Sequence, residues 1–352
     1  MAKIEDILEL ERIEENIFRG IATETLLPRT FGGQVAGQAL VSAVRTVVPE
    51  FQVHSLHGYF LRPGDPTKGI VYQVDRIRDG RSFCTRRVTA VQDGHAIFTM
   101  SASFHADDQG IEHQDEMPTV PTPEELPDAK TLVEQGREEF AWALREWSNW
   151  DFRFVPPEHM VADRGVAAHQ RVWFRSRVTL PDDPVFHVCT LAYMSDMTLL
   201  GSAHVIHPDE KTQDASLDHA MWFLRPFRAD DWLLYDQTSP SAGFGRALTQ
   251  AGSTTAEETW SPQSFRKDSR AICVSPDLPT SVVTCGGRRQ HERKAVRRGY
   301  CAAAHHSDDW GARTPRRRAG TSSGARIGRC AHRRAAPRKR TRRGRRHRDS
   351  RR

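Results

Sequence analysis

The stretch VHSLHGYFLRPG, residues 53–64, decides the fold, because a second version of it, SLDHAMWFLRPF, returns at residues 216–227. Within the two copies, the pentapeptides YFLRP and WFLRP align. Each copy follows a segment of small and apolar residues, 31–48 and 184–203, typical of a helix buried on all sides. A repeat in matching positions indicates an internal duplication. We therefore expect two halves, each a buried helix wrapped by antiparallel sheet, with the sheets joined edge to edge and sites between them.

Strand signals surround the first copy. Residues 69–105 carry the pairs Asp79-Gly80 and Asp93-Gly94 between runs of strand-forming residues, which predicts two hairpins. In the last run the apolar residues Phe98, Met100, Ala102 and Phe104 alternate with their neighbours, so one face of that strand is apolar. The first half is therefore expected to be a helix followed by an antiparallel meander.

The chain is expected to divide into four parts. Residues 1–105 form the N-terminal half, 106–150 a linker and helix, and 151–250 the C-terminal half, whereas 251–352 form an arginine-rich tail. The tail holds 27 of the 51 Lys and Arg side chains but only 8 of the 45 Asp and Glu side chains, so the folded part is net acidic. The folded part thus gives no electrostatic case for binding nucleic acid.

Other compositional features describe a reduced, cytoplasmic protein without a membrane segment. The cysteines show neither a disulfide framework nor the spacing of a zinc site. No stretch of about 18 uncharged apolar residues occurs, and the N-terminal segment lacks the apolar region of a signal peptide.

Asp196 is the first candidate for chemistry, because it interrupts the apolar helix predicted over 184–203. Its neighbours one turn away, Ala192, Leu199 and Leu200, are apolar. A carboxylate on such a face is costly unless it is hydrogen-bonded or lines a cleft, and desolvation would make it a better base. The alternative interpretation is that Asp196 caps a break in the helix.

Ser216 is the second candidate, since it opens the repeated strand and its hydroxyl can donate to a carboxylate or hold a water. The alternative interpretation is a turn residue, because most serines in such positions are turn residues. The histidines near the repeat are interpreted as structural or solvated, a set comprising His54, His57, His204, His207 and His219. The one match to a serine-nucleophile motif, GTSSG at 320–324, lies among arginines without a preceding strand and is discounted. GGQVAG at 32–37 lacks the Lys of a phosphate loop and indicates close helix packing.

These residues together carry a family resemblance. FGGQVAGQAL, HSLHGYFLRPGDP, RDGRSF, the SD pair in a buried helix, SLDHAMWFLRPF and WLLYD occur in order between about residue 5 and residue 250. The chain resembles the TesB-like acyl-CoA thioesterases, also called acyl-CoA thioesterase II, which have an α+β double hot-dog fold. The resemblance implies hydrolysis of fatty acyl-CoA to free acid and coenzyme A, without a cofactor or metal, by a protein that forms homo-oligomers.

The resemblance also implies roles for the two candidates. In that family an Asp, a Ser or Thr and a Gln position a water that attacks the thioester, and the first two map onto Asp196 and Ser216. The Gln should lie in the last strand, in a stretch ending like VQEGL. No such stretch occurs here, so the last hairpin of the sheet is expected to be missing.

A shifted reading frame accounts for this departure. If one G was lost from the DNA after the codon of Gln250, the original frame, with permitted third bases, can read GRIYHRGGDLVATVVQEGLTR, which contains the missing hairpin and VQEGL. Out-of-frame reading of a GC-rich message also explains why residues 251–352 hold 24 Arg but only three Lys. The competing hypothesis is a genuine basic arm that binds nucleic acid or an acidic membrane by charge.

Two further functional alternatives remain open from the sequence. A hot-dog enoyl-CoA hydratase would bind the same class of substrate but would use an Asp-His pair. A non-catalytic acyl-CoA binder would be expected if the last hairpin is truly absent.

Overall fold

The computed structural model describes residues 2–106, 110–111, 113–114, 116–159, 168–210, 212 and 214–255, together with the backbone of 268–273. All these residues lie within the part of the chain that ends at Gln290. Helices occur at α1 (Ile4–Leu8), α2 (Gly32–Val44), α3 (Ala129–Glu134), α4 (Ala141–Glu146) and α5 (Pro184–Met194), and short 3-10 helices at Pro123–Glu125, Glu138–Phe140, Pro157–His159 and Leu199–Ala203. The strands are β1 (Glu11–Glu14), β2 (Ile17–Gly20), β3 (Phe51–Phe60), β4 (Ile70–Asp79), β5 (Phe83–Gln92), β6 (His95–Ala106), β7 (Trp150–Phe154), β8 (Ala168–Ser176), β9 (Asp218–Phe223), β10 (Leu233–Gly243), β11 (Arg246–Thr255) and β12 (Asp268–Cys273).

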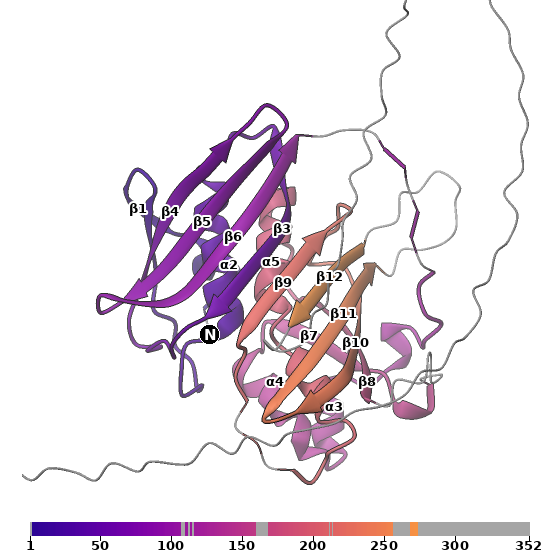
Figure 1. Ribbon diagram of the computed structural model, residues 1–352. Helices are drawn as coiled ribbons and strands as arrows, with labels where there is room; N and C mark the ends of the chain where they lie inside the picture. Colours follow the sequence, from indigo (N-terminus) through magenta and orange to yellow (C-terminus); the bar gives the residue numbers. More distant parts are fainter. Residues whose placement is uncertain are drawn as a thin grey trace, which may run out of the picture. The chain divides into compact units, whose positions relative to one another are not determined.

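The described strands form one antiparallel sheet in the order β1-β2-β4-β5-β6-β3-β9-β12-β11-β10-β8-β7 (Figure 1). The order is nearly symmetric about its centre, because β2, β4, β5, β6 and β3 have β8, β10, β11, β12 and β9 as counterparts. At the centre, the two copies of the repeat pair directly, with Gly58 opposite His219 and Ser55 opposite Trp222. The predicted double hot-dog, with sheets joined edge to edge, is therefore confirmed.

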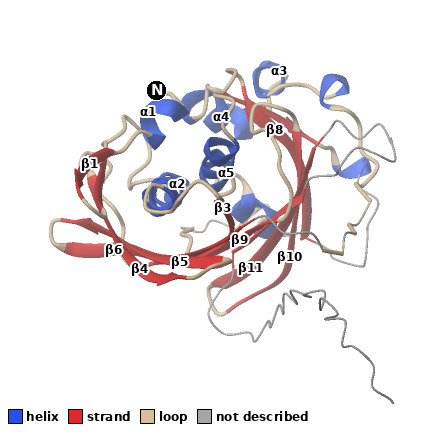
Figure 2. Cartoon of the chain, turned by 90° about the horizontal axis from the view of Figure 1, so that it is seen from above, coloured by secondary structure: helices blue, strands red, loops and turns tan. Residues whose placement is uncertain are grey.

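The sheet curves around the two central helices, α2 and α5 (Figure 2). Ten of the thirteen residues of α2 are buried, and α5 is buried from Cys189 to its end, as the apolar segments predict. The helices approach each other closely through glycine, since a Cβ atom on Gly33 would overlap the carbonyl oxygen of Tyr193. This close approach brings the end of α5 to the start of α2.

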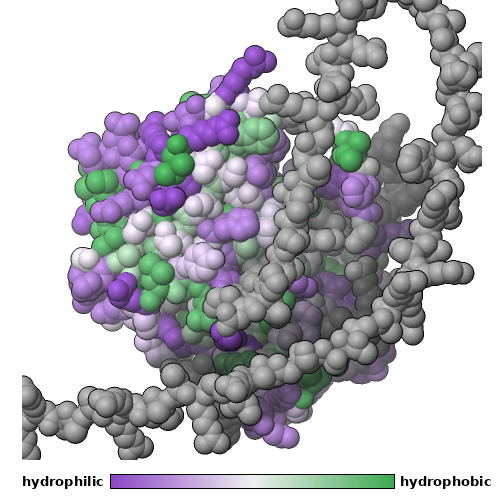
Figure 3. Space-filling view, viewed as in Figure 1, coloured by the Kyte–Doolittle hydropathy of each residue, from purple (hydrophilic) through white to green (hydrophobic). Residues whose placement is uncertain are grey.

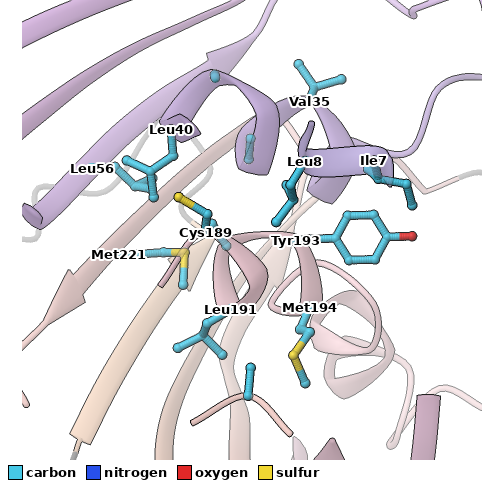
Figure 4. Close-up of a cluster of buried hydrophobic side chains, with 14 of the residues drawn as sticks. Ile7, Leu8, Val35, Leu40, Leu56, Cys189, Leu191, Tyr193, Met194 and Met221 are labelled. Atoms are coloured by element: carbon cyan, nitrogen blue, oxygen red, sulfur yellow. The ribbon is translucent and has the colours of Figure 1, made fainter. Parts of the chain in front are cut away.

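The core joins the two halves. Figure 4 shows Leu40 of α2 on the same side as Cys189 of α5, with Leu56 of β3 and Met221 of β9 nearby, and Val35 and Leu191 on other sides of the two helices. All belong to one cluster of buried apolar residues. The opposite face of β4, β5 and β6 is mainly polar, with isolated apolar side chains (Figure 3). One face of the sheet therefore packs on the helices and the other meets solvent.

Hairpins form where the Asp-Gly pairs predict them. β4 and β5 flank Gly80, and β5 and β6 flank Asp93 and Gly94, both of which have positive φ. The alternation in β6 is also confirmed, since Phe98, Met100 and Phe104 are buried. The linker helix expected before residue 150 is instead broken into α3 and α4, at Gly136, whose φ of 87° ends the first helix.

The expectation of a missing hairpin needs correction. β11 does not end at Gln250 but continues to Thr255, and β12 lies between β11 and β9. Sheet pairing uses backbone groups that every residue except proline possesses, and two facing open edges favour a third strand between them. The backbone position of the last strand is thus filled, although the side chains of β12 are not described. Residues 256–267 and 274–352, including most of the tail, lie outside the described residues.

Candidate active site

Asp196 lies two residues after the end of α5. Its position combines both interpretations of the sequence, because the helix does break at this point and the carboxylate does face a pocket. Ser216, two residues before β9, donates a hydrogen bond from its hydroxyl to Oδ1 of Asp196 over 2.7 Å. The two candidates from the sequence are therefore in direct contact.

The first half of the chain contributes the third partner. The backbone N–H of Gly33 donates to the Asp196 carboxylate. Gly33 is the second residue of α2, and Phe31, which precedes the helix, supplies no side-chain cap. The N–H groups at a helix N-terminus carry partial positive charge and favour an anion, so the carboxylate of one half occupies the helix start of the other.

Close packing makes Gly32 part of the same arrangement. A Cβ atom at Gly32 would lie 2.6 Å from Oδ2 of Asp196 and 3.0 Å from the ring of Phe60. Such contacts are shorter than van der Waals packing allows. A larger residue here would have to displace the carboxylate or the Phe60 ring, which gives the FGG motif a physical reason beyond helix packing.

The environment makes Asp196 a stronger base than an ordinary aspartate. Burial raises the pKa of its carboxyl to about 6, against the hydrogen bonds from Ser216 and from Gly33, which lower it. A carboxylate with this pKa is charged at pH 7 yet holds a proton better than a solvated one. Its geometry and basicity suit the removal of a proton from a water molecule.

Asp196 and Ser216 line a pocket of about 470 Å³ between the two halves. Its walls include the apolar residues Phe31, Val35 and Phe60, and the cations Arg29 and Arg62 also line it. A second pocket, of about 780 Å³, shares Ser216 and Leu217 with the first and extends to the β10–β11 hairpin. The candidate site thus lies between two adjoining pockets, an arrangement that suits a long substrate cleaved near its middle.

The histidines occupy different positions from one another. His57 is exposed and its ring packs edge-on against Trp222, and His54 contacts Ser103. His204 is hydrogen-bonded to Asp214 over 2.8 Å. These agree with the structural or solvated roles expected of them.

His219 is fully buried and bonded to Ser195, the residue before Asp196. Among the described residues, the side chain hydrogen-bonded to Asp196 is that of Ser216, so Asp196 is not part of an Asp-His pair such as the hydratase alternative would use.

Sequence reasoning missed two contributors, the N–H of Gly33 and the Ser195–His219 contact. The alternation of the strand SLDHAMWF was a usable signal for the second, because it places His219 on the same face as the buried Met221 and Phe223. The N–H of Gly33 could not be found from sequence, since any helix start offers such a group.

Within the described residues no group of three or more His, Cys, Asp or Glu side chains is placed to hold a metal ion. Nor is any helix in the described part of the chain long and apolar enough to cross a membrane.

Comparison with known proteins gives consistent results over both halves. The model of the acyl-CoA thioesterase N-terminal domain matches residues 24–105, and the acyl-CoA thioesterase model matches residues 144–259. Human acyl-coenzyme A thioesterase 8 is 41% identical over 256 residues, covering 69% of this chain and 80% of that protein. Acyl-CoA thioesterase 2 of Haemophilus influenzae is 38% identical, covering 69% of this chain and 88% of its own. The crystal structure of the acyl-CoA thioesterase II TesB2 from Mycobacterium marinum is 52% identical with a TM-score of 0.65, covering 76% of this chain and 94% of its own.

Proposed function

The chain belongs to the acyl-CoA thioesterase family and hydrolyses acyl-CoA thioesters, and we propose that the Asp196 carboxylate acts as the general base with Ser216 as its partner. The observation that carries the proposal is the 2.7 Å bond between these residues at a pocket shared by both halves. Fatty acyl-CoA, with a long apolar arm and a long polar arm on either side of the thioester, fits the two adjoining pockets.

The proposed reaction proceeds in two steps. Asp196 takes a proton from water while the water oxygen attacks the thioester carbonyl carbon, and Ser216 holds that water in place. Positive charge at the start of α2 stabilises the oxyanion that forms. The carbon–sulfur bond then breaks, the leaving thiolate takes the proton from Asp196, and the products are the fatty acid and coenzyme A.

Thiol release from a medium-chain acyl-CoA tests these roles. We expect Asp196→Asn to lower kcat by about a thousandfold, as the loss of a general base does. We expect Ser216→Ala to lower kcat by about tenfold to a hundredfold, as the loss of a group that positions the water does. Asp236→Asn is the matched control, because it removes a partly buried carboxylate that is bonded to His169 and Arg171. Activity of Asp196→Asn equal to that of the control would show that Asp196 is not the base.

We further propose that the chain after Gln250 is read out of frame and that the Gln of the family site is lost with it. The proposal is supported by the change from acidic to arginine-rich composition after Gln250. The chain as printed is then expected to turn over slowly. Sequencing the DNA around codon 250 tests this, and an intact reading with no missing base would refute it.

We also propose that the halves at residues 1–105 and 151–250 arose by duplication, and that the protein is a cytoplasmic homo-oligomer. Free thiols at Cys84 and Cys189 fit a reducing compartment. Light scattering coupled to size exclusion tests the assembly, and a monomer at micromolar concentration would contradict it.

A further inference from the structure

Ser195, the residue directly before Asp196, is completely buried and is held at each of its polar groups. Its N–H donates to the carbonyl of Leu191 over 2.9 Å, and its carbonyl accepts from the hydroxyl of Tyr235 over 2.8 Å. Its Oγ donates to the carbonyl of Ala192 over 3.0 Å and lies 2.9 Å from Nε2 of His219. The peptide that leads into Asp196 is therefore fixed from both the helix and the sheet.

The sheet contacts come from two strands that are not neighbours. His219 lies on β9 and Tyr235 on β10, and β12 and β11 separate them in the sheet. Both side chains are almost fully buried, at 2% and 1% exposed. Two separate points on the sheet thus hold one residue, which prevents rotation of the turn after α5 as well as its translation.

His219 acts here as a neutral hydrogen-bonding group. Burial lowers the pKa of its imidazole to about 4, so the ring carries no charge at pH 7. With the proton of the Ser195 hydroxyl directed to the carbonyl of Ala192, the lone pairs of this hydroxyl can accept from an Nε2–H of His219. A neutral ring adds no positive charge beside Asp196, so the carboxylate keeps its raised pKa.

The position of Asp196 depends on this turn. Its carboxylate must reach the hydroxyl of Ser216 and the N–H of Gly33 at the same time, and these come from different halves. A displacement of about 1 Å far from the reacting atoms can lower a rate a hundredfold. Building on the proposed role of Asp196, we propose that Ser195, His219 and Tyr235 are positioning residues that hold Asp196 in its productive geometry.

The duplicated half supplies a matched control. Tyr72 is the third residue of β4, as Tyr235 is of the equivalent β10, and it is equally buried. Its hydroxyl donates to Oε1 of Gln38 over 2.7 Å, within the middle of α2 rather than at a helix end that leads to the site. Tyr72→Phe and Tyr235→Phe therefore remove the same buried group from equivalent positions, and only the second is connected to Asp196.

Steady-state hydrolysis of a medium-chain acyl-CoA by the full chain tests the proposal. We expect Tyr235→Phe to lower kcat about tenfold with KM changed less than twofold, and Tyr72→Phe to leave both unchanged. His219→Leu should lower kcat at least as much as Tyr235→Phe does. His219→Gln should keep most of the parent kcat, because the glutamine amide can donate in place of Nε2–H. Equal kcat in the two Phe variants, or no recovery in His219→Gln relative to His219→Leu, would overturn the proposal.

A second measurement needs no turnover. Carboxyl NMR should place the pKa of Asp196 near 6 in the parent chain and in Tyr72→Phe, and clearly lower in Tyr235→Phe and Ser195→Ala, because a released carboxylate reaches water. An unchanged titration in both of the latter variants would refute the positioning role. If Asp196→Asn stays active, the proposed function fails; if it is inactive while Tyr235→Phe behaves as Tyr72→Phe, only the positioning role fails.

Discussion

Replacing Asp196 by Asn should stabilise the folded protein at neutral pH while it removes the proposed base. Burial raises the pKa of this carboxyl from 3.8 to about 6. A carboxyl whose pKa is higher in the folded chain than in the unfolded chain binds its proton more tightly when folded, so its charged form opposes folding. The stability it provides is fully present below about pH 4 and is lost as the pH rises through about 6.

The expected magnitude follows from the same values. At about 1.4 kcal/mol for each pH unit, a pKa of about 6 in place of 3.8 corresponds to ~3 kcal/mol of folding free energy. Asparagine retains the shape but turns an N–H₂ group toward one of the two donors, which costs about 1–2 kcal/mol. We therefore expect Asp196→Asn to be more stable than the parent by about 1–2 kcal/mol at pH 8 and less stable by about that amount near pH 4.

Urea unfolding at one-unit steps from pH 4 to pH 8 measures this difference, provided that the slopes with urea agree between the two proteins. Asp236→Asn is the control, because its expected change in the free energy of unfolding at neutral pH has the opposite sign. Although burial by itself raises the pKa of Asp236, hydrogen bonds from His169 and Arg171 lower it overall, so its charge favours folding at neutral pH. A free-energy difference for Asp196→Asn that is destabilising and independent of pH would refute the argument that its charge is desolvated.

Four further outcomes are expected. Since Asp196 must be charged to act as a base, kcat/KM should fall about tenfold for each pH unit below about 6; rates that stay level to pH 5 would contradict this. Removing the Ser216 hydroxyl takes away a bond that lowers this pKa, so the acidic limb of the pH profile of Ser216→Ala should move to higher pH, and a limb that stays in place would separate Ser216 from the base. Gly32→Ala should lower kcat at least tenfold, because its Cβ meets the Asp196 carboxylate at 2.6 Å, whereas Gly110→Ala, with open space around it, should have no effect. Restoring one base after codon 250 should accelerate thiol release, and equal rates before and after would show that the restored Gln is not part of the site.

The fold could be predicted because its determinants are periodic and local. Each local pattern predicts one element: the two mainly apolar segments predict helices, the Asp-Gly pairs predict turns, and the repeated stretch predicts a strand. The repeat also predicts how the two halves are related. Asp196 could be singled out because a carboxylate in an apolar segment is costly wherever it lies. The broken linker helix was missed because the glycine that ends α3 is one unfavourable residue in an otherwise helical pattern.

The contacts of the site could not be predicted from pattern, since they join residues far apart in the chain. The partners of Asp196 lie 20 residues later, at Ser216, and in the other half, at Gly33. β12 was missed for a different reason. Its sequence lacks the apolar alternation of the preceding strands, but backbone pairing to β9 and β11 does not require that alternation.

The near-symmetric fold also explains why chemistry is expected at one junction of the halves and not at its counterpart. At the start of α2 the second N–H, from Gly33, donates to Asp196. At the start of α5 the equivalent N–H, from Val185, already donates to the side chain of Asp183, and Pro184 before it has no N–H. Neither of the first two residues of that helix therefore has an N–H group left for an incoming anion.

The helix ends differ in the corresponding way. Counted from the last helical residue, Thr46 after α2 stands where Asp196 stands after α5. Its hydroxyl accepts from Nε of the buried Arg86 over 2.9 Å, so this position carries no base and a cation fills its surroundings. Of the two equivalent junctions between the halves, one therefore has a carboxylate facing an uncapped helix start, and the other has neither feature.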